Sequence, residues 1–73
     1  MNYTYSMIIE WSDEDQVFVV SLPEFGPHAK THGETYEEAV SMGRECLESL
    51  IDAYQADGQA LPEPARFRGA VSA

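Results

Sequence analysis

The sequence predicts a small α+β domain in which one long helix packs on one face of a small antiparallel sheet, in the order β-β-β-α-β. In residues 3–11, large apolar or aromatic side chains alternate with mostly polar ones, as in a strand with one buried face. Residues 17–22 form an apolar run after a polar turn, which indicates an antiparallel hairpin. Residues 36–57 carry apolar side chains at helical spacing, which predicts an amphipathic helix.

The first strand is expected to turn its large side chains toward the core. Its buried face would carry Tyr3, Tyr5, Met7, Ile9 and Trp11. Its other face would carry Thr4, Ser6, Ile8 and Glu10. Aromatic rings on the buried face would add area to a core that is short of it.

The second strand is apolar on both faces, because Val17 and Val19 lie opposite Phe18 and Val20. Such a strand is either central and covered twice, or half covered by a partner. Only one helix is expected in this chain, so the second cover is expected from another chain. Val17 and Val19 are therefore candidate self-association residues.

Between these strands lies a polar turn with three adjacent acids, Asp13, Glu14 and Asp15. An EF-hand loop needs alternating oxygen ligands, a central glycine and a later glutamate, and this turn has none of that spacing. A solvated hairpin turn is the main interpretation, and an acidic contact for a partner is the alternative.

Residues 23–27 contain two prolines and a glycine, which interrupt the strand ladder. A short third strand is expected at residues 28–31. His28 and His32 have the spacing of a zinc pair on a helix, but on an extended segment they would lie roughly 13 Å apart. No metal site is expected there, and His32 is expected to shape the turn before the helix.

The helix is expected to start after Thr35, which is a good N-cap, with Glu38 completing a capping box. Gly58 supplies a stop. The buried arc would hold Tyr36, Ala39, Val40, Gly43, Leu47, Leu50, Ile51 and Tyr54. The outward face carries five acids and one basic residue, Arg44. The acids are Glu37, Glu38, Glu45, Glu48 and Asp52. That face is either a solvated acidic surface or a surface that meets a basic partner.

The segment after the helix, residues 59–64, is expected to return as an extended, polyproline-like stretch. Residues 66–71 are a possible last strand.

The chain has 73 residues, and a single domain of that size has a marginal core. One cysteine excludes an internal disulfide, and no cluster of cysteine and histidine suggests structural zinc. Self-association remains as the supplementary source of stability, so a homodimer or higher oligomer is expected.

The net charge is −9, from thirteen acids against four bases. Such a surface repels phosphate backbones, so direct nucleic-acid binding is not expected, whereas a basic protein partner is favoured. The sequence shows no secretion signal and no apolar run approaching the roughly 20 residues of a membrane span. The expected location is the cytoplasm.

Two motifs resemble the HicB family, the antitoxins of bacterial toxin–antitoxin pairs. The first is Leu22-Pro23-Glu24-Phe25-Gly26, followed by Thr31-His32-Gly33-Glu34-Thr35-Tyr36-Glu37-Glu38-Ala39. The second is Leu61-Pro62-Glu63-Pro64. The resemblance covers about residues 3 to 66 and implies a truncated ribonuclease-H-like fold. It also implies a partner, a small basic ribonuclease toxin of the HicA type, whose active site the antitoxin covers.

The chain departs from the family pattern at Pro27, where a cysteine or small residue is common, and at its end at Ala73. The second departure leaves no room for the DNA-binding helices that many members carry, so this chain is expected to be a short form without that tail. Autorepression is therefore not expected of it. An orphan member that self-associates and has no toxin is the alternative.

Catalysis is not expected, and no catalytic, cofactor or metal residues are assigned. Ribonuclease-H chemistry needs several carboxylates converging on two metal ions, and the acids of this chain point in different directions. A metal-dependent nuclease remains a remote alternative. The candidate partner-binding residues are Asp13, Glu14, Asp15, Glu24, Phe25, Glu45 and Glu48.

Overall fold

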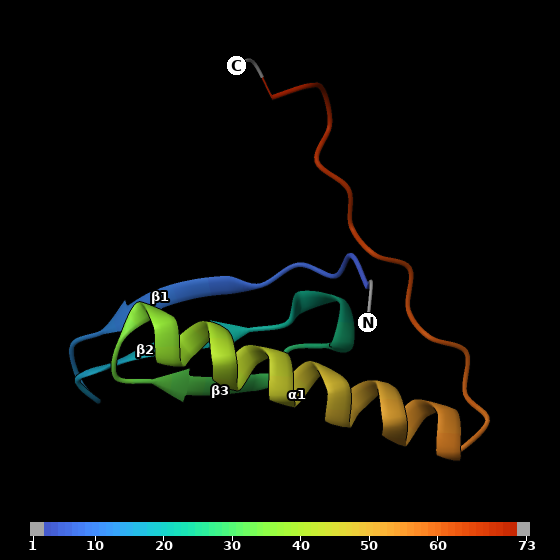
Figure 1. The fold of residues 1–73 in the computed structure, drawn as a ribbon, viewed down its shortest axis with the longest axis horizontal. Helices are drawn as coiled ribbons and strands as arrows, with labels where there is room; N and C mark the ends of the chain where they lie inside the picture. Colours follow the sequence, from blue (N-terminus) through green and yellow to red (C-terminus); the bar gives the residue numbers. More distant parts are fainter. Residues whose placement is uncertain (1–2, 72–73) are drawn as a thin grey trace.

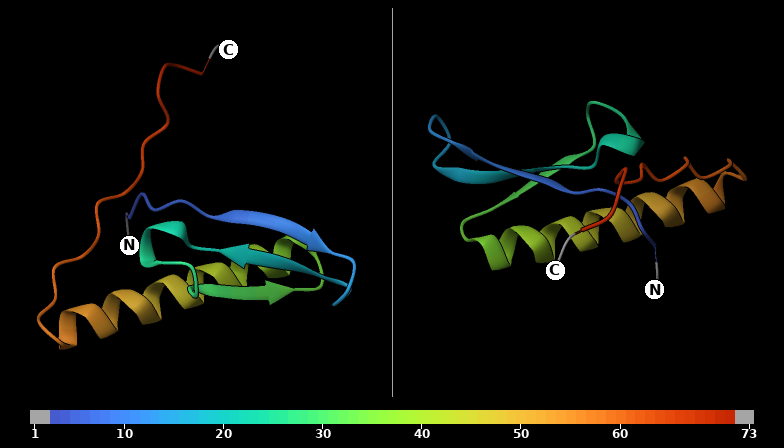
Figure 2. Two further views of the ribbon diagram at one scale, coloured as in Figure 1. Left: turned by 180° about the vertical axis from the view of Figure 1, so that it is seen from behind. Right: turned by 90° about the horizontal axis from the view of Figure 1, so that it is seen from above.

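A computed structural model describes residues 3–71 of the chain. Its elements are β1 (Ile8–Ser12), β2 (Val17–Ser21), the 3-10 turn η1 (Pro23–Phe25), β3 (Lys30–Gly33) and α1 (Tyr36–Ala56). The strands form one antiparallel sheet in the order β1-β2-β3, and α1 lies along one side of it (Figures 1 and 2). The predicted α+β arrangement of an antiparallel sheet with one long helix is confirmed.

The register of the strands sorts the side chains into two faces. Ile9, Val20 and Thr31 form one row across the sheet, and Glu10, Val19 and His32 form the next. Because successive residues of a strand point to opposite faces, these two rows belong to opposite faces. The row that contains Val20 faces α1, and the row that contains Val19 faces away from it.

The core lies between α1 and the sheet. Its buried apolar side chains are Val20, Leu22, Ala39 and Ile51. Two glycines let the layers approach closely. A Cβ on Gly33 would lie 2.5 Å from the backbone nitrogen of Ala39, and one on Gly43 would lie 2.7 Å from the sulfur of Met7. The backbone of α1 therefore rests almost directly on β3.

Both predicted ends of the helix are confirmed. The hydroxyl of Thr35 accepts a hydrogen bond from the Glu38 backbone N–H at 3.0 Å. The Glu38 carboxylate in turn accepts from the Glu34 N–H at 2.7 Å, one residue earlier than in a regular capping box. At the other end Gly58 has a φ of 68°, which the turn after the helix requires.

The first strand is shorter than predicted, because it begins at Ile8 rather than at Tyr3. The segment opposite residues 3–7 leaves the sheet at Pro23 to form η1. The Ser6 backbone N–H therefore has no ladder partner and donates to the side-chain carboxylate of Glu24 at 2.9 Å instead.

The third strand occupies residues 30–33 and not the predicted 28–31. A turn holds the chain just before it, with the Ala29 N–H donating to the Gly26 carbonyl at 3.3 Å. His32 consequently lies inside β3, paired with Val19, rather than in the turn before the helix.

The predicted last strand at residues 66–71 is wrong, since the chain there pairs with no strand of the described sheet. Upstream, Pro62 and Ala65 are tied to the N-terminal segment and to η1 by hydrogen bonds. Beyond them the chain leads away from the sheet (Figure 1), and the Phe67 side chain is 77% exposed. Only three of the four predicted strands are therefore present.

Aromatic rings line the two ends of the core rather than filling it. Trp11 packs edge-on against Phe18, which lies 4.3 Å from the ring of Tyr36. At the other end, Phe25 contacts the rings of Tyr5 and Tyr54. Trp11 is 48% exposed and Tyr3 is 40% exposed, so the expectation that the first strand buries all its rings is wrong for these two. Trp11 lies on the edge strand β1, whereas α1 packs on β3 and β2, and Tyr3 lies in the segment before β1.

Candidate partner-binding surfaces

The outward side of α1 carries five carboxylates within one arc, which we call the helix strip. Its members are Glu37, Glu38, Glu45, Glu48 and Asp52, and all are exposed. At 100° per residue they fall within an arc about 100° wide. The buried Ala39 and Gly43 lie on the opposite side of the helix, and the buried Ile51 lies at the margin of the strip. The packing of α1 on the sheet thus directs all five carboxylates into solvent.

The three predicted turn acids form a second exposed acidic group at the end of the β1–β2 hairpin. Asp13 accepts a hydrogen bond from the Trp11 indole N–H at 2.9 Å, and Asp15 donates its backbone N–H to the Ser12 hydroxyl at 3.3 Å. These bonds fix the shape of the turn. The turn and the first turn of α1 lie at the same end of the molecule in Figures 1 and 2.

Glu24, a predicted partner-binding residue, has an intramolecular role in the structure. Its carboxylate accepts hydrogen bonds from the backbone N–H groups of Ser6 and Ala65, each at 2.9 Å. It therefore ties the N-terminal segment and the segment after α1 to η1. The Tyr5 hydroxyl adds a parallel link by donating to the Pro62 carbonyl at 2.7 Å. We call this set of bonds the Glu24 clip.

The Glu24 clip changes the acidity of its carboxylate. Partial burial opposes ionisation, but the N–H groups of Ala65 and Ser6 outweigh it and hold the pKa of Glu24 below its ordinary value. The pKa of the Tyr5 hydroxyl is raised, mainly by desolvation and then by neighbouring Tyr3 and Glu24. Both shifts favour the protonation states that make the clip.

Phe25, the other predicted partner-binding residue in η1, is half-buried. Its ring lies 4.8 Å from that of Tyr5 and 5.5 Å from that of Tyr54. No sequence pattern indicates these contacts, because Tyr5 and Tyr54 are far from Phe25 along the chain. Phe25 and Glu24 thus connect η1 to the N-terminal segment, to the last turns of α1 and to the segment that follows α1.

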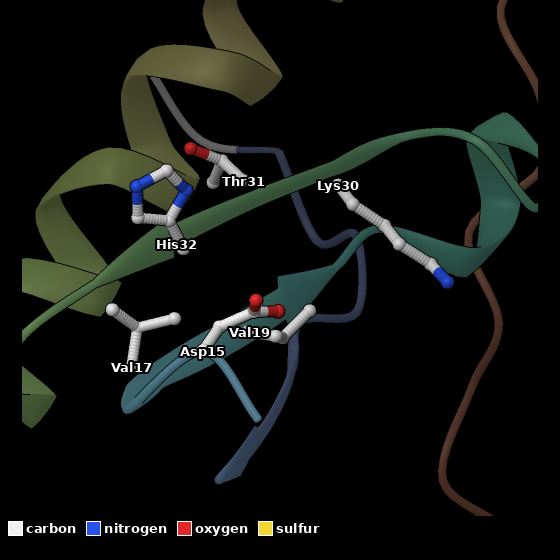
Figure 3. A pocket seen from close by; sticks show the side chains of 6 residues that line it. All are labelled: Asp15, Val17, Val19, Lys30, Thr31 and His32. Carbon is white, nitrogen blue, oxygen red and sulfur yellow. The ribbon is translucent and has the colours of Figure 1, made fainter. Parts of the chain in front are cut away.

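The sheet face opposite α1 is the third surface, which we call the open face. Val17, Val19 and Ile8 lie on it together with Glu10, Lys30 and His32. No described segment of the chain crosses it (Figure 2). A hollow of about 440 Å³ here is lined by Asp15, Val17, Val19, Lys30, Thr31 and His32 (Figure 3).

Sequence reasoning placed Val17 and Val19 on this face but missed its two basic members. The sequence pattern predicts a third strand that ends at Thr31, which would place His32 in a turn. The alternation of Lys30 and His32 with Thr31 and Gly33 is the signal that marks them as one face of a strand.

A second hollow, of about 390 Å³, lies between the N-terminal segment and α1. Its walls are Tyr3, Tyr5, Met7, Arg44, Leu47 and Glu48. It therefore places apolar and aromatic side chains directly beside Glu48, a member of the helix strip.

Within residues 3–71, no three histidine, cysteine, aspartate or glutamate side chains are grouped so that they could hold a metal ion. The helix in this part of the chain is not apolar enough over a sufficient length to cross a membrane. The chain has no match among the protein-family models searched or among curated protein sequences.

Proposed function

We propose that this protein is an antitoxin-like inhibitor that binds a small basic ribonuclease toxin of the HicA type, covers its active site and performs no chemistry itself. The resemblance of its motifs to the HicB family suggests the class of partner. The helix strip is the observation that carries the proposal, because it presents five exposed carboxylates on one side of a rigid helix.

The charge arrangement supports a basic partner. The net charge is −9, and the helix strip places five exposed acids on one side of α1. A surface of one sign attracts an oppositely charged protein and speeds its encounter. Since exposed charges are screened over about 8 Å at physiological ionic strength, such binding weakens as salt is added.

The second hollow supplies an apolar component beside these charges. Specific interfaces combine an apolar centre with a polar rim. Met7 and Leu47 can receive an apolar side chain of the partner while Glu48 pairs with a neighbouring cation. Glu24 and Phe25 contribute indirectly, because they hold the N-terminal wall of this hollow in place.

The test is co-expression with the product of a short basic reading frame encoded beside this gene, scored for rescue of growth. We expect wild-type protein to rescue growth and Glu48→Lys to rescue it poorly, with binding that depends less on salt. Glu10→Lys makes the same change in charge on the open face and serves as the matched control. Equal rescue by wild type and Glu48→Lys would contradict a role for the helix strip.

The turn acids are tested separately, by reversing the charges of Asp13, Glu14 and Asp15 together. Unchanged neutralisation and unchanged salt dependence would remove the turn from the interface. The absence of chemistry is tested by incubating the purified protein with RNA and Mg²⁺ or Mn²⁺. Cleavage that disappears when its own carboxylates are replaced would contradict the proposal.

A second candidate function, an orphan interaction module that self-associates and has no toxin, is favoured by the open face. Apolar Val17, Val19 and Ile8 are left uncovered there by the described chain. The lack of any neighbouring basic reading frame, or of any rescue by it, would favour this candidate.

A further inference from the structure

We infer that the open face binds the open face of a second copy of this chain, around a two-fold axis that runs along β2 and pairs Glu10 of each copy with His32 of the other. This inference does not depend on the proposed toxin, because the helix strip lies on the other side of the sheet.

The centre of the open face is apolar. One edge carries the carboxylate of Glu10, and the other carries the ammonium group of Lys30 and the imidazole of His32. Val17 and Val19 lie on the middle strand. Glu10 lies on β1 at one edge, and His32 lies on β3 at the other edge. Glu10, Val19 and His32 occupy the same row across the sheet. A face of this kind is complementary to a copy of itself only in certain orientations.

The orientation follows from the rows. Packed sheets keep their strands within about 30° of each other and lie about 10 Å apart. A two-fold axis along β2 places β1 of one copy over β3 of the other, so that Glu10 meets His32 twice. The same axis stacks Val19 on its own counterpart. An axis across the strands would instead place β1 over β1, bringing the two Glu10 carboxylates together.

The neighbouring row fits the same axis. Ile8 and Lys30 both pair with Ser21 and so lie at one height on opposite edges. Ile8 is 45% exposed in the single chain. In the dimer the aliphatic part of Lys30 from the other copy would cover it, with the ammonium group left in water.

The size of the face sets the strength of the contact. Its three strands have only four or five residues each. An interface of this size is at the small end for specific complexes, so a concentration-dependent equilibrium between monomer and dimer is expected.

The experiment is sedimentation or native mass spectrometry over a range of concentrations. Wild-type protein should dimerise, and Glu10→Lys and His32→Glu should each raise the dimer dissociation constant about tenfold or more, because each removes both cross-pairs. An equimolar mixture of the two variants should form the mixed dimer, in which one cross-pair is the original Glu10–His32 pair and the other joins the introduced lysine at position 10 to the introduced glutamate at position 32.

Matched controls separate this contact from other effects. Glu48→Lys makes the same charge change as Glu10→Lys on the helix strip and should leave dimerisation unchanged. Glu10 and His32 are exposed, so helix content by circular dichroism should stay that of wild type. A wild-type monomer at all concentrations would overturn the inference and leave the open face to another partner. So would a mixture of variants that stays monomeric.

Discussion

The two faces of β2 differ in a way that separates stability from binding. Val20 points toward α1 and is fully buried, whereas Val19, its neighbour in the chain, points to the open face and remains partly accessible. On the covered side the neighbours are apolar side chains and closely packed backbone. On the open side the neighbours include Glu10 and His32.

This difference shows how a strand that is apolar on both sides is used. The covered face has no buried polar or charged residues among those described. It therefore contributes to the stability of the fold through the burial of apolar surface alone. The open face mixes apolar and charged groups, as the surfaces of non-permanent interfaces do. Substitutions on the two faces should therefore change different properties.

The largest effect is expected from truncation of the covered side. Ile51→Ala removes a side chain that is 1% exposed and should lower the free energy of unfolding by about 2–5 kcal/mol, since it leaves a cavity. Ile8→Ala, the matched change on the open face, should cost less than about 1 kcal/mol. Urea denaturation at low protein concentration measures both. Equal losses would contradict the distinction between the faces.

A methyl group added at Gly33 tests how closely α1 rests on the sheet. Its Cβ would lie 2.5 Å from the Ala39 nitrogen, and backbone cannot move aside as a side chain can. We expect Gly33→Ala to destabilise the fold by about 3 kcal/mol. Gly69→Ala has open space around it, although its φ of 101° also disfavours alanine. A larger loss from Gly69→Ala than from Gly33→Ala would show that the close contact is unimportant.

The adjacent valines allow a comparison at constant size. Val20→Thr buries a hydroxyl in an apolar environment and should cost about 2 kcal/mol of stability. Val19→Thr keeps its hydroxyl accessible, so the unfolding midpoint should change little while dimerisation weakens. Thermal unfolding and sedimentation on the same samples would check both. Weakened dimerisation without loss of stability in Val20→Thr would reverse our assignment of the faces.

The smallest effect concerns the Glu24 clip, which belongs to neither face. Its folded-state pKa lies below the ordinary 4.5, so its stabilisation is complete above that pH and is lost as the pH falls through the folded pKa. The amide resonances of Ser6 and Ala65 should titrate together with a midpoint below 4.5. Glu24→Gln should abolish this shared titration. Independent titration of the two amides in wild-type protein would contradict the clip.

Local signals in the sequence predicted the elements well where the responsible residues are neighbours. Thr35 and Glu38 mark the start of α1, and Gly58 marks its end, because caps act over one helical turn. The hairpin also follows from a local pattern. Alternation in β2 correctly separated Val17 and Val19 from the covered side.

Long-range contacts explain what the sequence could not show. Glu24 looked like a free surface acid, yet its hydrogen-bond partners include Ala65, which is 41 residues away. The same anchoring directs residues 66–71 away from the sheet, where a strand was predicted. The basic edge of the open face was missed because the position of β3 depends on the turn at Gly26–Ala29.

The Glu24 clip also marks a boundary in the distribution of charge. It holds the chain as far as Ala65, and the next residues include Arg66 and Arg68, half of the lysine and arginine side chains. Trypsin-like cleavage after Arg66 would leave every hydrogen bond of the clip intact. Loss of Arg68 by this cut would change the net charge from −9 to −10. Trimming at this point would thus make the domain a stronger polyanion without touching its core.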